Sequence, residues 1–186
     1  MSTPARALRE ILAAGRTIWS AGAYDALSAL LIQEAGFDAV FTTGFGVSAS
    51  HLGQPDVELY TMTENLGVVR NMVSTVRKPV IADGDTGYGN AINVMRTVRE
   101  FERAGVAGIH IEDQVFPKKC GHFEGKAVIP TREMVDKIKA AADARQDANL
   151  QIVARTDARA IEGFDAAIAR AQAYVEAGAD VTFVEA

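Results

Sequence analysis

One pattern occurs three times along this chain, as EAGFDAV at 34–40, RAGVAGI at 103–109 and EAGADVT at 176–182. In each copy a helix-forming stretch ends at a glycine, and a run of mainly apolar residues follows at once. Glycine accepts the left-handed backbone that commonly closes an α-helix. The pattern therefore indicates a helix followed directly by a buried strand, which is the repeating unit of a parallel α/β sheet.

The same alternation extends along the whole chain. Strands are expected at 17–21, 39–43, 79–82, 108–111, 151–154 and 181–184, and helices at 25–35, 63–76, 91–104, 132–144 and 164–177. Thr61, Thr63 and Thr131 are candidate helix N-caps, and residues 1–15 have the pattern of an amphipathic helix. A long segment with few helix signals covers 114–130.

These elements make about six strand–helix units, whereas a closed (β/α)8 barrel has eight units and typically about 250 residues. Two α/β architectures fit: an open, doubly wound sheet that is complete as it stands, or a TIM-type barrel truncated after the sixth strand. We favour the truncated barrel, because ending on the acid of Val184-Glu185-Ala186, just after a strand, is odd for a complete domain. Residues 1–186 are then one barrel domain whose C-terminal units are missing.

The composition argues against several classes of protein. The 186 residues are 48% hydrophobic and 23% charged, with a formal net charge of −5. No basic stripe stands out, so nucleic acid is a poor candidate for a partner. No run of about 18 apolar residues occurs, which predicts no membrane span. The single cysteine, Cys120, allows no internal disulfide and fits a cytoplasmic location.

Charged residues collect where the predicted strands end. Asp83 and Asp85 follow the third strand, Glu112 the fourth, Arg155 the fifth and Glu185 the sixth. In a parallel barrel these ends lie on one face, where active sites are built. Carboxylates without neighbouring cysteine or histidine suit a hard cation such as Mg²⁺. The alternative is that the two aspartates are turn residues of the stretch DGDTGYG.

A second cluster is the stretch KKCGH at 118–122, inside the long segment after the fourth strand. A lone cysteine is often a small buried hydrophobe. The cationic neighbours of Cys120 instead favour a thiolate, and such a thiol can give or take a proton. The alternative is a surface loop with an incidental cysteine.

Three further features bear on ligand binding. The Gly/Ser-rich loop 42–48 opens toward a short helical stretch, and its backbone N–H groups could hold a carboxylate or a phosphate. Arg155 could clamp a substrate carboxylate, or pair with Glu112 or Asp157, and both can hold at once. His110 lies on a strand and is expected to be a hydrogen-bonded core histidine.

Four motifs together resemble the isocitrate lyase/phosphoenolpyruvate mutase superfamily: DGDTGYG at 83–89, HIEDQ at 110–114, KKCGH at 118–122 and ARTDA at 154–158. The likeness runs from about Gly22 to the last residue. It is greatest for the 2-methylisocitrate lyase and 2,3-dimethylmalate lyase group, and oxaloacetate hydrolases are similar. Phosphoenolpyruvate mutases resemble the same fold but lack the cysteine motif, so its presence favours a lyase.

The resemblance implies the role of each site residue. Mg²⁺, or Mn²⁺ in its place, would be the cofactor, with Asp83 as its direct ligand. The groups that would hold metal-bound waters are Asp85, Glu112 and Asp56. Cys120 would protonate the carbanion-like product from a gate that closes over the substrate in relatives. The other catalytic and substrate-binding groups would be Lys118, His122, Arg155, Glu112, Thr43, Gly44, Phe45, Gly121 and Glu185.

The implied activity is Mg²⁺-dependent cleavage of a C–C bond in a di- or tricarboxylic 2-hydroxy acid, giving pyruvate and a second carboxylate. The expected substrate is a 2-alkylmalate or a methylisocitrate-like acid, and the full-length protein is expected to be a homotetramer. Phe41 and Phe45 depart from the pattern of 2-methylisocitrate lyases, which favours another 2-alkylmalate. The alternatives are an oxaloacetate hydrolase, a phosphoenolpyruvate mutase-like enzyme, or an inactive fragment.

Overall fold

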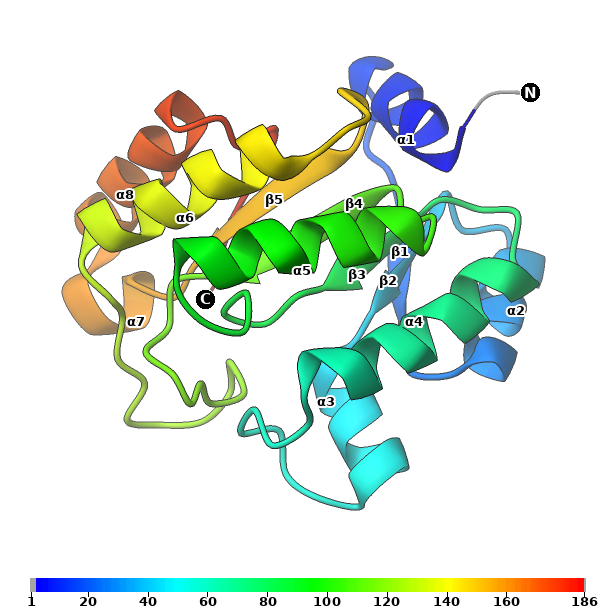
Figure 1. Ribbon diagram of the computed structural model, residues 1–186, viewed down its shortest axis with the longest axis horizontal. Helices are drawn as coiled ribbons and strands as arrows, with labels where there is room; N and C mark the ends of the chain where they lie inside the picture. The colour runs from blue at the N-terminus through cyan, green and yellow to red at the C-terminus, as the bar shows by residue number, and fades with distance from the viewer. Residues whose placement is uncertain (1–2, 186) are drawn as a thin grey trace.

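Six parallel strands form one sheet in the computed structural model, which describes residues 3–185 (Figure 1). Their order in space is their order in the chain: β1 (Ser20–Ala23), β2 (Ala39–Thr42), β3 (Val80–Asp83), β4 (Gly108–Glu112), β5 (Gln151–Thr156) and β6 (Val181–Val184). A doubly wound sheet reverses its strand order at a switch point, and this sheet has no reversal among its six described strands. The open-sheet alternative is therefore wrong, and the predicted barrel architecture is confirmed as a half-barrel.

Helices connect the successive strands. Their bounds are α1 (Pro4–Ala13), α2 (Ala26–Glu34), α3 (Gly44–Val47), the π-helix η1 (Ser48–Leu52), α4 (Met62–Thr75), α5 (Ala91–Arg103), α6 (Thr131–Ala144), α7 (Arg159–Glu162) and α8 (Phe164–Glu176). The amphipathic N-terminal helix and the five long connecting helices were predicted close to these bounds. The short helix α7 was not predicted, because its four residues carry no clear periodicity.

Side chains close the amino ends of several helices. Thr61 accepts a hydrogen bond from the backbone of Glu64, whose carboxylate accepts one from the Thr61 backbone, so this predicted cap of α4 is confirmed as a capping box. Thr63 instead lies inside α4. Thr131 was wrongly predicted as a cap. It is the first residue of α6, because the chain already turns at Pro130, whose carbonyl accepts the first hydrogen bonds of the helix.

The first strand begins three residues later than predicted. The Asp38 carboxylate accepts hydrogen bonds from the Trp19 backbone N–H and from the Arg16 guanidinium. This turn leaves Ser20–Ala23 to pair in parallel with Ala39–Thr42. The strand consists of Ser, Ala and Gly, which have weak strand propensity, so the sequence pattern placed it on the larger apolar residues just before it.

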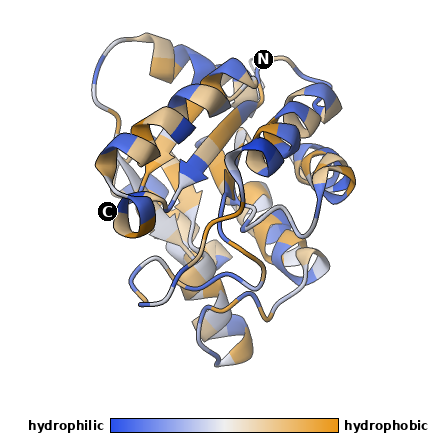
Figure 2. Ribbon diagram, turned by 90° about the vertical axis from the view of Figure 1, so that its left-hand side faces the viewer, coloured by the Kyte–Doolittle hydropathy of each residue, from blue (hydrophilic) through white to orange (hydrophobic). Residues whose placement is uncertain are grey.

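The core lies between the sheet and helices α4, α5, α6 and α8, where Phe101, Ile109, Met134, Ile152 and Tyr174 are fully buried. Every residue of β4 is buried, as expected for a strand covered on both faces. Figure 2 shows the helices around the sheet with hydrophobic and hydrophilic residues alternating along them. This packing fixes the carboxyl ends of the strands relative to one another.

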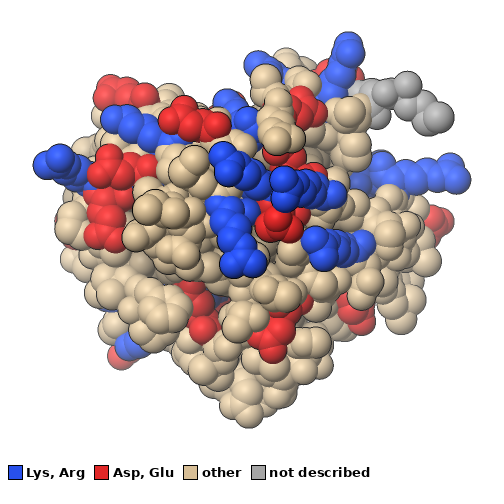
Figure 3. Space-filling model, in the orientation of Figure 1, with Lys and Arg blue, Asp and Glu red and all other residues tan. Residues whose placement is uncertain are grey.

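The outer face of α5 is charged. Lys and Arg side chains gather over it with Asp and Glu among them (Figure 3), and Glu100 contacts Arg103 at 2.9 Å and Arg70 at 3.7 Å. Such exposed ion pairs each contribute only about 0–1 kcal/mol. Within residues 3–185, none of the helices combines the length and the apolar character that a membrane span needs.

Candidate active site

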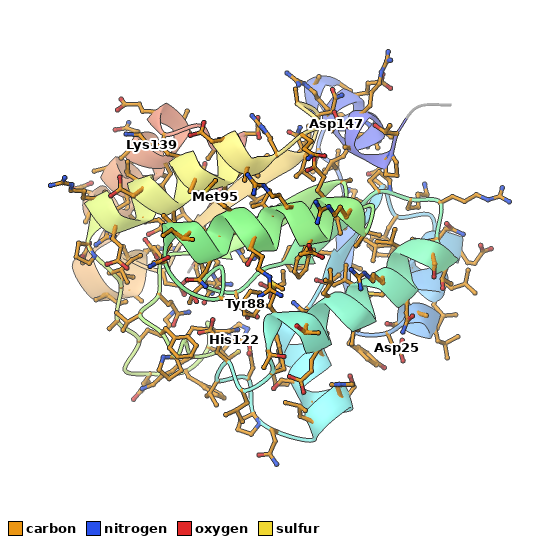
Figure 4. All side chains as sticks on the ribbon, viewed as in Figure 1. Asp25, Tyr88, Met95, His122, Lys139 and Asp147 are labelled. Carbon is orange, nitrogen blue, oxygen red and sulfur yellow. The ribbon has the colours of Figure 1, made fainter. Side chains whose placement is uncertain are left out.

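The segments that follow β2 to β6 enclose a cavity of about 430 Å³ at the carboxyl ends of the strands. Its walls are formed by Phe41, Thr43, Gly44, Phe45, Asp56, Asp83, Lys118, Cys120, Gly121, His122, Phe123, Arg155 and Glu185. All but Phe41 and Phe123 are among the site residues predicted from the sequence. The two other predicted acids, Asp85 and Glu112, do not line the cavity and are fully or almost fully buried. In Figure 4, His122 and Tyr88 lie below α5, on the side where these segments meet.

Lys118 lies at the centre of the acidic cluster. Its ammonium is 2.8 Å from the Asp56 carboxylate and 3.1 Å from Asp85 Oδ1, and the side chain is almost completely buried. Burial opposes this charge, but the field of Asp85, Asp83, Glu112 and Asp56 outweighs burial and raises the pKa of Lys118 above its usual value. Lys118 is therefore a buried cation in contact with Asp56 and Asp85 and within the electrostatic influence of Asp83 and Glu112.

The buried acids differ in the direction in which their pKa values are shifted. Burial, reinforced by the charge of Asp83, raises the pKa of Asp85 although Lys118 opposes the shift. Burial also raises the pKa of Glu112 well above its usual value, against the attraction of Arg155 and Lys118. Protons on these two carboxyl groups therefore relieve the crowding of negative charge when no further cation is present.

Asp83 ends β3 and is the most firmly oriented acid of the cluster. Its Oδ2 accepts a hydrogen bond from the Gly44 backbone at 3.1 Å, and its Oδ1 accepts one from the Asp85 backbone at 3.0 Å. Burial alone would raise its pKa, but His110 and Lys118 outweigh burial and lower it. This shift favours the ionised form of Asp83, which is the form that a carboxylate needs in order to bind a metal ion.

His110 is buried, as predicted, and its predicted hydrogen bond is reduced to a close contact with Asp83, the contact that lowers the pKa of Asp83. Its Nδ1 lies 3.3 Å from Asp83 Oδ1, yet neither ring nitrogen makes a hydrogen bond of good geometry within the described chain. The ring packs instead between Phe41 and Phe183, with centroid distances of 5.6 and 5.7 Å. The sequence could not show that Phe41 of β2 and Phe183 of β6, each two strands away from β4, pack against this ring.

The donor set suits a hard cation. Asp56 Oδ1 and Asp85 Oδ1 are buried and accept no hydrogen bond within residues 3–185. Each contacts the Lys118 ammonium, whose positive charge balances these carboxylates. In the described chain no three carboxylate, imidazole or thiol groups converge on one point as a preformed site. Mg²⁺ usually takes only one or two carboxylates and keeps several waters, so these oxygens fit it.

The segment Lys118–His122 forms one wall of the cavity. Cys120 is 8% exposed, and its backbone N–H donates to the Asp56 carbonyl at 3.0 Å. Lys126 Nζ donates to the Gly121 carbonyl at 2.8 Å, and Gln114 bonds the Lys119 backbone through both its N–H and its C=O. The alternative of a cysteine on the surface is wrong, because Cys120 is buried and lines the same cavity as Asp56 and Asp83.

Arg155 is surrounded by acids. Its guanidinium donates two hydrogen bonds to Asp157 at 2.8 and 2.9 Å, and it lies 3.2 Å from Glu185 and 3.5 Å from Glu112. Burial opposes its charge, but the hydrogen bonds to Asp157 and the nearby carboxylates raise its pKa further above its usual value. The predicted ion pairs with Glu112 and Asp157 are both present. A substrate carboxylate would add to this network or replace Glu185 within it.

The loop after β2 approaches the acids closely. Thr43 caps the short helix α3 by accepting a hydrogen bond from the Gly46 backbone at 3.2 Å, which directs the Gly44 N–H toward Asp83. A Cβ atom on Gly44 would lie 2.8 Å from Asp83 Oδ2 and from the Tyr60 hydroxyl. Glycine is therefore required at position 44 for the close approach. The next residue, Phe45, is 56% exposed and lines the cavity.

Sequence reasoning missed two residues that shape the site. Phe123 supplies apolar wall, and Lys126 fixes Gly121 and pairs with Asp157 at 2.9 Å. Phe41, which the sequence singled out only as a departure from the family pattern, lies in β2 directly before the Gly-rich loop and also lines the cavity. Lys126 carries no local signal, because its partner lies 31 residues further along the chain.

Comparison with known proteins shows which family of proteins this chain matches. A family model described as phosphoenolpyruvate phosphomutase matches residues 8–186. 2,3-Dimethylmalate lyase of Eubacterium barkeri is 55% identical over 185 residues, which are 100% of this chain and 64% of that protein. 2-Methylisocitrate lyase of Aeropyrum pernix is 51% identical over 186 residues, 100% of this chain and 59% of that protein.

A solved structure also matches closely. The crystal structure of phosphonopyruvate hydrolase in complex with oxalate and Mg²⁺ has a TM-score of 0.90 and 38% identity, and the match covers 98% of this chain and 63% of that one. The chain thus spans between 59% and 64% of the length of these three proteins.

Proposed function

This chain belongs to the isocitrate lyase/phosphoenolpyruvate mutase superfamily, and we propose that it carries the active site of a divalent-metal-dependent lyase. The proposed reaction cleaves the C2–C3 bond of a 2-alkylmalate or methylisocitrate-like 2-hydroxy acid, giving pyruvate and a second carboxylate. One observation carries the proposal: the Cys120 thiol, the Asp83 carboxylate and the Arg155 guanidinium line a single cavity.

The cavity has the size and chemistry for a small polyacid. Its volume of about 430 Å³ suits a di- or tricarboxylic acid. Arg155, Lys118 and His122 offer cationic or N–H groups to carboxylates, and Thr43, Gly44 and Phe45 line the same cavity. The Thr43 and Gly44 backbone N–H groups already donate to the Ala23 carbonyl and the Asp83 carboxylate. Phe41 and Phe45 supply apolar contact that suits an alkyl branch on the substrate.

A divalent cation, Mg²⁺ or Mn²⁺, is part of the proposal. Asp83 would be its direct ligand, and Asp85, Glu112 and Asp56 would hold its bound waters. When bound, such a cation polarises the hydroxyl and carboxylate oxygens of a 2-hydroxy acid and favours loss of the hydroxyl proton. Support comes from Asp56 Oδ1 and Asp85 Oδ1, which contact the Lys118 ammonium but accept no hydrogen bond within residues 3–185, and from the Mg²⁺ complex of the matching hydrolase.

The chain's own residues would handle charge and protons. When the C2–C3 bond breaks, its electron pair passes to C3, which becomes a carbanion conjugated with the adjacent carboxylate. Arg155 and His122 would stabilise that negative charge. The Cys120 thiol would give its proton to C3, leaving a thiolate near Lys118. The base that takes the hydroxyl proton is unassigned.

The partners and location follow the same reasoning. We propose that the full-length protein is a cytoplasmic homotetramer, and that residues 1–186 form a single domain of it. The mass of the full-length protein in solution tests the proposed oligomeric state.

A product assay tests the reaction. The full-length protein should release pyruvate from at least one member of a panel of 2-alkylmalates and methylisocitrate, and chelation of divalent metal should abolish that release. Cys120→Ser should lower turnover at least about a hundredfold, because the hydroxyl is a far weaker acid, while Mg²⁺ binding by calorimetry stays nearly unchanged. Unchanged turnover in this variant would remove Cys120 from the mechanism. Oxalate and acetate formed from oxaloacetate, without pyruvate release, would identify a hydrolase instead.

A further inference from the structure

Glu58 has an unusual backbone. It lies between η1 and α4 with φ of 56°, in the left-handed region that residues other than glycine rarely adopt. Its side chain is 6% exposed. A non-glycine residue persists in such a conformation only where its surroundings hold it there, which directs attention to what the carboxylate contacts.

The Glu58 carboxylate joins two segments of the site. Its Oε1 accepts a hydrogen bond from the Thr86 hydroxyl at 2.6 Å, and its Oε2 accepts one from the Lys118 backbone N–H at 2.8 Å. Thr86 belongs to the turn that carries Asp85, and Lys118 begins the segment that carries Cys120. One side chain therefore ties the acid-bearing turn to the thiol-bearing wall.

Thr86, which donates to Glu58 from the acid-bearing turn, is itself held in place by hydrogen bonding. The Thr86 carbonyl accepts a hydrogen bond from Lys137 Nζ at 3.1 Å, and Lys137 is a buried residue of α6. Two residues before Glu58, the Asp56 carbonyl accepts the Cys120 N–H at 3.0 Å. The backbone of Lys118–Cys120 is thus held by residues 56–58, which are themselves fixed to the sheet and its helices.

We propose that Glu58 is a positioning residue that holds the Lys118–His122 segment against the cavity and so places the Cys120 thiol. Glu58 does not line the cavity and touches it only through the Lys118 backbone. The inference rests on the proposed function in one respect, that Cys120 is the group whose position matters for turnover.

Three substitutions at Glu58 separate the effect of losing its carboxylate from the effect of its left-handed backbone. Glu58→Ala removes both acceptors and keeps the left-handed strain, whereas Glu58→Gly removes both acceptors and relieves it. Glu58→Gln keeps the two shorter contacts, because the amide oxygen can accept from Lys118 while the amide N–H₂ donates to the Thr86 hydroxyl; it loses the 3.4 Å hydrogen bond from the Thr86 backbone N–H. Val98→Ala, in the buried face of α5, is the control for a general loss of stability.

The rate of Cys120 alkylation by iodoacetamide reports how often the segment leaves the cavity, because Cys120 is the single cysteine of the sequence and is buried. We expect alkylation at least about tenfold faster in Glu58→Ala and Glu58→Gly, since each loses a hydrogen bond to a charged acceptor. We expect Glu58→Gln to stay within about threefold of the unsubstituted protein, and Val98→Ala to behave likewise. Hydrogen exchange of the Lys118 amide should follow the same order.

The outcomes distinguish the two proposals. Glu58→Gly alkylating at the unsubstituted rate would overturn the inference, because Glu58 would then be no more than a turn residue. If its alkylation rate rises and the unsubstituted protein cleaves a 2-alkylmalate, kcat should fall by about tenfold with KM changed less than about threefold. Faster alkylation in a protein that cleaves no such acid would leave the positioning role standing and remove the proposed function.

Discussion

Replacing Lys118 by methionine tests how the acidic cluster is balanced. The ammonium of Lys118 lies between Asp56 and Asp85, and the field of Asp83 and Glu112 also acts on it. Methionine has a similar length and no charge, so Lys118→Met leaves the packing nearly intact and removes the cation. The acids would then face one another unneutralised.

The size of the effect follows from the burial of the pair. Removing one partner of a buried ion pair costs about 3–5 kcal/mol of unfolding free energy, because a charge remains uncompensated. Asp85 and Glu112 already have raised pKa values and can take up protons, so we expect about 3 kcal/mol, at the lower end of that range. Folded-state pKa values above the unfolded ones mean that stability is lost as the pH rises, so the deficit of the variant should be larger at pH 8 than at pH 6.

A divalent cation should reverse much of this loss. Binding at a hundred times the dissociation constant adds about 2.7 kcal/mol to the stability of the folded state. In the unsubstituted protein the Lys118 ammonium competes for the same oxygens, so we expect added Mg²⁺ to stabilise Lys118→Met more than the unsubstituted protein.

Urea unfolding with MgCl₂ and with EDTA measures both effects. The control is Lys119→Met, because the Lys119 ammonium is bonded only to the exposed backbone carbonyls of Glu124 and Gly125 among the described residues. This variant should lose less than about 1 kcal/mol and respond to Mg²⁺ as the unsubstituted protein does. The reasoning is refuted if Lys118→Met is no less stable than Lys119→Met, or if Mg²⁺ stabilises both variants equally.

Four further substitutions test the scaffold by urea unfolding. Asp157→Asn should lower the free energy of unfolding by about 3 kcal/mol at pH 7. Arg155 and Lys126 hold the pKa of Asp157 below 3.8 despite its burial, so this deficit should shrink as the pH falls below about 4. A deficit that does not change with pH would contradict the ion-pair argument. Gly84→Ala should cost about 1–3 kcal/mol, since its Cβ would lie 2.8 Å from the His110 backbone oxygen; Gly67→Ala, with no atom within 4 Å, should instead gain up to about 1 kcal/mol, and equal effects would be contrary evidence. Phe101→Ala should cost about 3–5 kcal/mol because Phe101 is fully buried, and a loss below about 1 kcal/mol would be inconsistent with the core described above.

Local signals in the sequence located most helices and strands and placed the charged residues of the site at the carboxyl edge of the sheet. Helix ends carry glycine, strands are short apolar runs, and the acids directly follow strands, so short-range rules suffice for each of these. The same rules misplaced the start of β1, because its small residues carry no strand signal and the turn at Asp38 decides the boundary.

The sequence by itself determined that this is a chain of parallel strand–helix units with acids and a cysteine-bearing segment at the strand ends, since these patterns are local in the chain. Only the tertiary structure decided between a barrel and a doubly wound sheet, because strand order is a property of space. It also placed Lys118 beside Asp56, 62 residues away, and Glu58 between Lys118 and Thr86. Such long-range contacts depend on how whole loops pack, and no short stretch of sequence specifies them.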